Sequence, residues 1–340
     1  MALADARAIA RAERDWARAD ALRARIDEAG WKVEDAGFSY ALTPAAPPDL
    51  LEGAVPRYGS AASVPSVLDT PPTAAFTVVL LADTWPDDAT RMIAGLRAHA
   101  PAGTQVVVVE NAGSREQVAR LEEGAPDVAS VGGEAVEVVR TSVRLGRAAA
   151  LNVGLRRARG SIVVIADTSV EATGDALTPL ADVLADPSVA LTGGFGATSP
   201  DMRRFHEAAG PDVDAIEGRW LAFRRDDLVR LGPLDERFVY YLNLDTWWSL
   251  VLRAGSDPDA EPRRAVRIPL PLERHAQRGA SSLPDGERDR MSRRNFYLVL
   301  DRFRDRPDLL VSRRASPPAD VRGDSSVPGA SPDDAGERPA

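Results

Sequence analysis

The sequence predicts an α/β protein with a mixed, mostly parallel sheet, helices on both faces and a helical module at the N-terminus. Short apolar segments alternate with helical segments between residues 75 and 170. These apolar segments are continuous, which is typical of parallel strands that are buried on both faces of a sheet. In residues 2–29, apolar residues recur at three- and four-residue steps and predict an amphipathic helix.

Composition divides the chain into four parts. We expect a helical module at residues 1–42, a Pro-rich linker at 43–72, the α/β domain at 73–311 and a disordered tail at 312–340. In the module, the helix over 2–29 ends at Gly30, and short strands are expected at 31–35 and 38–42. The Pro-rich part predicts a linker or an extended strap laid over the α/β domain. The tail has too few apolar residues to form a core.

The expected strands and helices of the α/β domain alternate along the chain. The strands are 75–82, 104–111, 135–141, 161–167 and 265–275, and the helices are 86–100, 114–123, 146–159, 175–185 and 289–303. Ligands bind at the carboxyl ends of the strands in such sheets. Residues 82–84, Glu110, Asn111 and Asp167 are therefore candidate site residues.

Composition also excludes several classes of function. A net charge of −9, from 42 basic and 51 acidic residues, argues against a nucleic-acid-binding surface over the whole chain. The chain has no cysteine, which excludes disulfides, thiolate zinc sites and cysteine nucleophiles. No apolar stretch approaches the roughly 20 residues that span a bilayer, and the N-terminus lacks the apolar core of a signal peptide. We expect a cytoplasmic protein.

Five stretches of the α/β domain carry a resemblance to a known family. In chain order they are FTVVLLADTWPDD, VVVVENAGS, RLGRAAALNVGLRRARGSIVVIAD, FRRDDLVRLGPLDERFVYYLNLD and LPLERHAQRGAS. Together they resemble the family-2 glycosyltransferases of the GT-A (Rossmann-like) fold. They are similar, in turn, to the family's first strand and base-contacting loop, its second strand, the helix leading into its metal-binding strand, its acceptor segment, and the late strand whose histidine completes the metal site.

The resemblance implies an inverting transfer of a sugar from a nucleotide-diphospho-sugar. The acceptor it implies is a glycan, a lipid-linked molecule or a small molecule. The leaving diphosphate needs its charge neutralised by a divalent cation or by basic side chains. The acceptor hydroxyl group needs a carboxylate within hydrogen-bond reach to take its proton.

The resemblance also implies a role for each matched position. Asp245 is the expected catalytic base, and Asp235 shapes the acceptor pocket beside it. The residues expected to contact the nucleotide-sugar are Thr84, Glu110, Asn111, Arg147, Asn152 and Asp167. The resemblance further implies a divalent cation, Mg²⁺ or Mn²⁺, at Asp167, Ser169 and His275. A carboxylate and a hydroxyl group offer the oxygen ligands that such a cation prefers, and His275 matches the family's third metal ligand.

Each matched residue also has a structural interpretation. Asp167 then caps the turn after its strand, and Asp245 stabilises the first turn of a helix by about 1 kcal/mol. Glu110 is then a solvated strand-end acid, Arg147 a surface arginine and His275 a structural histidine.

The sequence departs from the family at three acidic positions. Ser169 stands where the second acid of an Asp-x-Asp motif is expected, and Leu242 and Asn243 stand where the family has Glu-Asp. An asparagine cannot act as a base. The alternative function is therefore a catalytically degenerate relative that binds a nucleotide-sugar or glycan, or acts as a scaffold.

The N-terminal segment ARAERDWARADALRARIDEAGWKVEDAGFSYAL resembles the C-terminal helical segment of cysteinyl-tRNA synthetases. None of the catalytic motifs of those enzymes is present, so the resemblance implies only a helical packing or interaction module. RNA binding through this module is a third alternative, and no DNA partner is expected. The basic helix expected at 289–303 is predicted to be a solvated face, with contact to the inner face of a membrane as its alternative.

Overall fold

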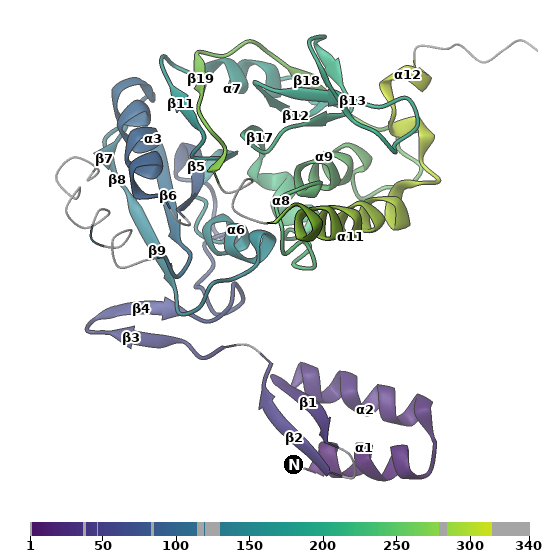
Figure 1. Ribbon diagram of the computed structural model, residues 1–340. Helices are drawn as coiled ribbons and strands as arrows, with labels where there is room; N and C mark the ends of the chain where they lie inside the picture. Colours follow the sequence, from purple (N-terminus) through teal and green to yellow (C-terminus); the bar gives the residue numbers. More distant parts are fainter. Residues whose placement is uncertain are drawn as a thin grey trace, which may run out of the picture.

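The structure, a computed structural model, describes residues 2–36, 39–45, 47–82, 85–113, 119, 130–278 and 284–314. It confirms the predicted α/β fold (Figure 1). A ten-stranded sheet runs in the order β15-β18-β12-β17-β10-β5-β6-β9-β4-β3. The strands in that order are Asp212–Val213, Arg264–Arg267, Val189–Gly193, Trp220–Arg224, Gly160–Ala166, Ala74–Ala82, Thr104–Glu110, Glu137–Thr141, Val55–Tyr58 and Leu50–Glu52.

The centre of the sheet is parallel and buried on both faces. β10, β5, β6 and β9 pair in parallel, and β17 joins β10 from the other side in antiparallel orientation. The continuous apolar residues of these strands enter two clusters, one on each face: Val79 belongs to one and its neighbour Val78 to the other. Burial on both faces is why the strands read as unbroken apolar runs in the sequence.

Different helices cover the two faces of the sheet (Figure 1). Apolar residues of α3 (Pro86–His99) and α7 (Thr178–Leu184) belong to one cluster. The other cluster holds residues of α6 (Arg147–Leu155), α8 (Arg225–Leu231), α9 (Leu244–Ala254) and α11 (Asp285–Phe303). The second set includes the helices that lead into the candidate site.

Four expected boundaries are wrong by several residues. The helix expected over 146–159 ends at Leu155, and the helix expected to begin at residue 175 begins at Thr178. The Asp175 carboxylate accepts hydrogen bonds from the N–H groups of Leu177 and Thr178, which delays the helix. The strand expected at 265–275 is divided into β18 and β19 (Leu272–Arg274), because prolines at 269 and 271 cannot donate to a ladder. The basic helix begins at Asp285 rather than residue 289.

Smaller elements complete the α/β domain. β11 (Val170–Ala172) pairs with β19, β7 (Ser130–Val131) pairs with β8 (Glu134–Ala135), and β13 (Gly196–Thr198) pairs with β14 (His206–Ala208) and β16 (Ala215–Ile216). A 3-10 turn, η1 (Pro307–Leu309), and α12 (Val311–Arg314) follow α11. The start of the expected tail, residues 312–314, is therefore helical, and its remainder lies outside the described residues. The expected helix at 114–123 also lies outside them, apart from Ala119.

Part of the Pro-rich segment extends the main sheet. β3 and β4 form a hairpin, and β4 pairs in parallel with β9 through Arg57 and Tyr58. The carbonyl oxygen of Tyr58 also accepts a bond from the Ser142 N–H group, at 2.9 Å. This hairpin brings Arg57 to the carboxyl end of β6, beside Glu110.

The N-terminal module contains two helices, so the single helix expected over 2–29 is wrong. α1 (Ala2–Ala12) and α2 (Trp16–Glu28) pack against each other, and β1 (Trp31–Ala36) pairs with β2 (Ser39–Pro44). Arg14 has a φ of 61°, and the Asp15 carboxylate caps α2 by accepting from the Arg18 N–H group. Figure 1 shows the module apart from the α/β domain, joined to it through the Pro-rich segment.

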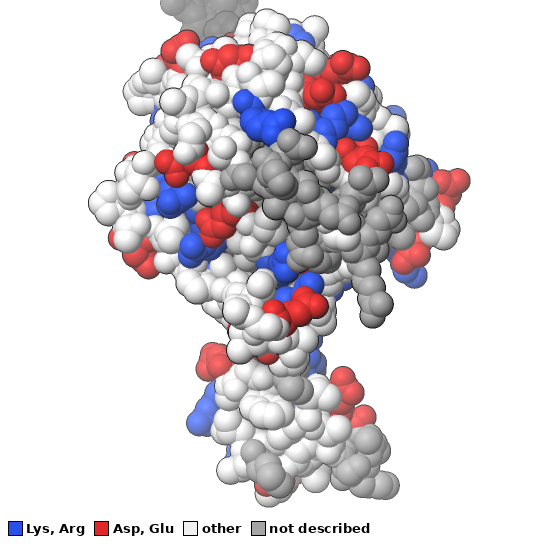
Figure 2. Space-filling model, turned by 90° about the vertical axis from the view of Figure 1, so that its left-hand side faces the viewer, with Lys and Arg blue, Asp and Glu red and all other residues white. Residues whose placement is uncertain are grey.

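Charge is mixed on the face of the molecule drawn in Figure 2. Basic and acidic side chains of the described residues are interspersed there, and neither sign forms a continuous patch. Among the described residues, no helix is long and apolar enough to cross a membrane.

Replacing Gly160 with alanine is expected to destabilise the α/β domain by about 1–3 kcal/mol. A Cβ atom at Gly160 would lie 2.3 Å from main-chain atoms of Phe76 and Thr77 on β5, so the strands would have to separate. Gly286 is the matched control, because a Cβ atom there meets nothing within 4 Å. Urea denaturation would measure both variants, and equal midpoints would contradict the expectation.

Candidate active site

A cavity of about 270 Å³ lies at the carboxyl end of β10. Charged residues of its walls come from four parts of the chain: Asp167 after β10, the Glu217–Arg219 segment before β17, Arg147 in the first turn of α6, and Asp245 in the first turn of α9. Leu151, Leu234, Leu242 and Trp248 add apolar walls. The cavity thus brings together three of the predicted site residues, Arg147, Asp167 and Asp245.

Asp167 is an acceptor for both an arginine and a serine. Its Oδ2 atom accepts from Arg147 Nη2 at 3.0 Å, and Oδ1 accepts from the Ser169 hydroxyl group at 2.6 Å and the Ser169 N–H group at 3.0 Å. Burial alone would raise the pKa of Asp167, but the Arg147 guanidinium and the Ser169 bonds outweigh it and hold the pKa below its usual value. Asp167 therefore presents an ionised carboxylate with a cation already beside it.

Asp245 is half-buried at the start of α9. Its Oδ2 atom accepts from the Gly218 N–H group at 2.9 Å, and Oδ1 accepts from the Thr246 N–H group at 2.8 Å. Burial raises the pKa of Asp245, and the two N–H groups and the Arg147 charge only partly oppose that rise. A carboxyl group in such a setting is a suitable general base once it is ionised. The two expectations for this residue, base and first-turn acid, are compatible in this geometry.

Leu242 and Asn243 take different positions around the cavity. Leu242 lines it, whereas the Asn243 amide donates to the Ser292 carbonyl oxygen at 3.3 Å and so joins the start of α9 to α11. Asn243 has a φ of 65°, a conformation that asparagine adopts more readily than most residues. Asn243 thus contributes to the entry into α9.

The sequence pattern gave no indication of two charged residues in this cavity. Glu217 and Arg219 lie in the turn before β17, with Glu217 Oε2 3.5 Å from Arg219 Nη1. Burial raises the pKa of Glu217, and the neighbouring Asp245 adds to the rise while Arg219 opposes it. The segment is irregular, so no periodic pattern marks it. The only available signal was the position of an acid three residues before a buried strand.

The residues predicted to hold a metal ion are bonded to other groups. The Ser169 hydroxyl group is a donor to Asp167, and His275 Nε2 lies 3.0 Å from Glu171 Oε2. The His275 N–H group donates to the Ser169 carbonyl oxygen at 2.7 Å, continuing the β11–β19 pairing. In the described part of the chain, no group of three or more His, Asp or Glu residues could hold a metal ion. In this arrangement the side chains of Ser169 and His275 are hydrogen-bonded to neighbouring carboxylates and do not fit a divalent cation. The metal site expected at Asp167, Ser169 and His275 stays a prediction.

Glu110 and Asn111 lie at the end of β6 and do not line the cavity. Glu110 is 0% exposed, and its carboxylate accepts from Arg57 Nη1 at 2.9 Å and from the Gly113 N–H group at 2.5 Å. The Asn111 amide exchanges two hydrogen bonds with the backbone of Leu145. Their predicted contact with the nucleotide stays a prediction. Thr84 lies outside the described residues.

Asn152 and Asp235 do not line the cavity, but both lie next to the Leu234 segment of its wall. Asn152 is buried, exchanges two hydrogen bonds with the backbone of Leu234 and donates to Glu236 Oε1 at 3.1 Å. Asp235 pairs with Arg237, whose bonds lower its pKa. Asn152 therefore fixes the segment that leads to the cavity wall. The acceptor-pocket role of Asp235 stays a prediction.

The structure is thus an α/β domain with a cavity whose charged groups gather at the carboxyl end of β10. The model of the family described as "Glycosyl transferase family 2" matches residues 84–238. The resemblance to family-2 glycosyltransferases of the GT-A fold is therefore confirmed over residues 84–238. It includes Arg147, Asp167 and Glu217 and ends before Asp245.

Solved structures of glycosyltransferases are similar to this chain at low identity. One is mannosyltransferase PcManGT from Pyrobaculum calidifontis with GDP-Man and Mn²⁺, at 23% identity over 61% of this chain and 57% of that chain, with a TM-score of 0.45. Another is GalNAc-T7 with UDP, GalNAc and Mn²⁺, at 14% identity over 59% and 43% of the two chains, with a TM-score of 0.49. A third is TarS from S. aureus, at 13% identity over 67% and 44%, with a TM-score of 0.45.

The chain spans about half the length of the first two of these structures. No curated protein sequence matches it.

Proposed function

We propose that this protein transfers a sugar from a nucleotide-diphospho-sugar to an acceptor hydroxyl group, with inversion at the anomeric carbon. The observation that carries the proposal is the convergence of Asp245, Asp167 and Arg147 on one cavity from three separate elements. A carboxylate with a raised pKa and a guanidinium beside a second carboxylate are the groups that a displacement with an anionic leaving group requires. The family match of residues 84–238 supports the same class of reaction.

The proposed reaction is a direct displacement. The acceptor oxygen forms a bond to the anomeric carbon as the bond from that carbon to the diphosphate oxygen breaks. The Asp245 carboxylate takes the proton of the acceptor hydroxyl group, and the diphosphate leaves with the electron pair. Arg147 stabilises the negative charge that develops on the diphosphate, with N–H donors suited to phosphate oxygens.

The acceptor side of the cavity is partly apolar. Leu234, Leu242 and Trp248 line it together with Tyr241, whose pKa is raised by burial. Apolar walls exclude water from the reacting groups and strengthen the electrostatic contacts among them. Apolar walls with an aromatic side chain suit the faces of a sugar ring, whether the acceptor is a glycan, a lipid-linked molecule or a small molecule.

One observation favours the second candidate, a nucleotide-sugar-binding or scaffold protein without transferase activity. Glu110, the acid expected to meet the nucleotide, is fully buried and bonded to Arg57 of the β3–β4 hairpin. The Ser169, Leu242 and Asn243 substitutions point in the same direction. Under this alternative, nucleotide-sugars bind and no sugar is transferred.

Incubation with a panel of UDP-, GDP- and dTDP-sugars is expected to release a nucleoside diphosphate. Release would be followed by chromatography, with added Mg²⁺, with added Mn²⁺ and with a chelator. Calorimetry with the same donors separates the two candidates, because binding without turnover supports the binding protein. Neither binding nor turnover across the panel would exclude both.

A further inference from the structure

The group that faces Asp167 in this protein is an arginine. We propose that Arg147, in place of a divalent cation, bridges Asp167 and the diphosphate of the donor. Nucleotide-diphosphate binding would then need no metal ion. The inference rests on the proposed function and specifies the chemistry of its donor subsite.

The bonds made by Asp167 leave it poorly suited to a metal ion. Oδ2 accepts from Arg147 at 3.0 Å, and Oδ1 accepts two bonds from Ser169. A cation at Oδ2 would have to compete with the positively charged guanidinium, and the Ser169 hydroxyl group, which donates to Oδ1, could add only a neutral oxygen ligand. A second carboxylate at position 169 would have attracted a cation strongly, whereas a serine contributes no charge.

Arg147 has the donors to act as the bridge. A guanidinium group carries five N–H donors in a fixed plane, and one bond to Asp167 leaves the others available for phosphate oxygens. The Arg147 side chain lines the cavity and is 19% exposed. It can therefore bind Asp167 and an anion in the cavity together, as a bridging cation does.

The backbone around Arg147 is held firmly. Its N–H group donates to the Val239 carbonyl oxygen at 3.0 Å, and the Ala148 N–H group donates to the Phe238 carbonyl oxygen at 3.0 Å. A Cβ atom on the preceding Gly146 would lie 2.9 Å from Val239 Cα, so glycine allows this close approach. The first turn of α6 is thereby fixed against the segment that leads to Asp245, and the guanidinium is positioned before a ligand arrives.

The other charged residues of the cavity, Arg219 and Glu217, are also consistent with diphosphate binding by arginine. Arg219 is a second guanidinium on its wall, and its carbonyl oxygen accepts from the Asp167 N–H group at 3.0 Å. Asp167 faces Arg147, and Glu217 faces Arg219. Each guanidinium therefore lies beside a carboxylate on the wall of the cavity.

Calorimetric titration of UDP and GDP tests the inference without using activity. We expect affinities in a chelator to lie within about threefold of those in Mn²⁺. Arg147→Ala is expected to weaken binding in the chelator by about ten- to hundredfold, the range for a lost hydrogen bond to a charged group. Arg294→Ala, at an exposed position on α11, is the matched control and is expected to bind as the wild type does.

Asp167→Asn separates the two chemistries and does not depend on the folding of the Arg147 variant. A metal ligand replaced by an amide would lose Mn²⁺-dependent binding, whereas an arginine bridge freed from its carboxylate should bind UDP or GDP at least as tightly. Thermal unfolding would show that each variant is folded. Wild-type binding that falls more than about tenfold in the chelator, together with a loss of Mn²⁺-dependent binding in D167N, would overturn the inference and leave the proposed function intact. No binding of either nucleotide under any condition would overturn both.

Discussion

Replacing Asp245 with asparagine is expected to slow sugar transfer by a factor of about 10² to 10⁴, the usual contribution of a general base. The amide keeps the size of the side chain and can still accept one hydrogen bond from Gly218 or Thr246, whose N–H groups lie 2.9 and 2.8 Å from the Asp245 oxygens. It cannot take the proton of the acceptor. The measurement is the rate of sugar transfer at saturating donor, with donor affinity expected to stay within a few-fold of the wild type.

The pH dependence of the reaction gives an independent test of this assignment. Burial raises the pKa of Asp245, so the carboxyl group becomes a base only above that raised value. The wild-type rate should therefore rise with pH through this pKa and level off above it, and the residual rate of D245N should lack that step. Asp301→Asn, an exposed acid on α11, is the control and should keep the wild-type profile. A wild-type rate in D245N would rule out this base and direct attention to Glu217 in the same cavity.

The same ionisation is linked to folding. Because the pKa of Asp245 is higher in the folded state, the folded protein holds this proton more tightly than the unfolded chain. That stabilisation is fully present below the unfolded value, about 3.9, and is lost as the pH rises through the folded value. The unfolding free energy of the wild type should thus decrease over this window relative to D245N, in the pH range where the transfer rate increases.

The sequence predicted the central strands well because their burial is visible as composition. Each of β5, β6 and β10 contains a run of four or five consecutive Val, Leu, Ile or Ala residues, and each strand is found within one residue of its expected bounds. The helix break in the N-terminal module was not visible in the same way. Arg14 and Asp15 are compatible with a helix, and only the backbone turn at Arg14 and the cap by Asp15 divide the two helices.

The candidate site was predictable where a residue ends a regular element. Asp167 follows β10 and Asp245 opens α9, so the order of elements indicated both. Glu217 and Arg219 lie in an irregular turn that has no periodicity. The contact between Arg57 and Glu110 joins residues 53 positions apart, through a hairpin that the proline content alone could not place on the sheet.

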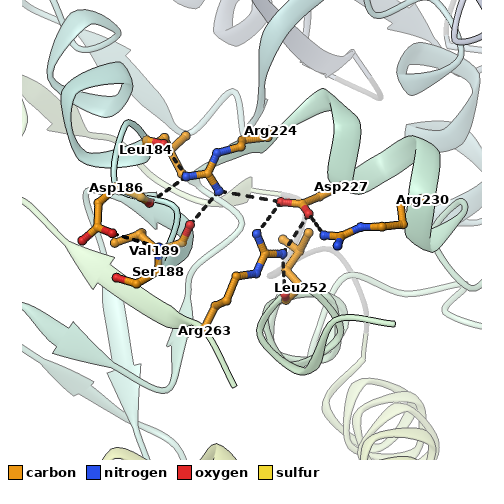
Figure 3. A network of polar contacts seen from close by, with 9 residues as sticks. All are labelled: Leu184, Asp186, Ser188, Val189, Arg224, Asp227, Arg230, Leu252 and Arg263. Atoms are coloured by element: carbon orange, nitrogen blue, oxygen red, sulfur yellow. Dashed lines mark hydrogen bonds and ion pairs between the residues drawn. The ribbon is translucent and has the colours of Figure 1, made fainter. Parts of the chain in front are cut away.

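Replacing Asp227 with alanine is expected to destabilise the α/β domain by about 3 kcal/mol. Asp227 is only 3% exposed and lies among three arginines (Figure 3). Its carboxylate accepts from Arg263 Nη2 at 2.8 Å and Nη1 at 3.1 Å, accepts a further bond from Arg230, and lies 4.0 Å from Arg224 Nη1. Removing it leaves the partly buried cations without their shared anion. The Arg230 side chain is 51% exposed, so solvent can compensate part of its charge. The expected loss of stability is therefore at the lower end of the range for a broken buried ion pair.

The loss of stability should be specific to the Asp227 carboxylate. Two of the arginines that it contacts also donate hydrogen bonds to backbone carbonyl oxygens, so they hold several segments together. Arg224 donates to the carbonyl oxygens of Val189 and Asp186, each at 2.7 Å, and Arg263 donates to that of Leu252 at 2.9 Å (Figure 3). Urea denaturation of D227A would give the loss. The neighbouring Asp226→Ala, an exposed acid in the same helical turn, should change stability by less than about 0.5 kcal/mol. A double-mutant cycle with Arg263→Ala should show coupling between the two residues. Equal stabilities of D227A and D226A would show that solvent already compensates the three arginines.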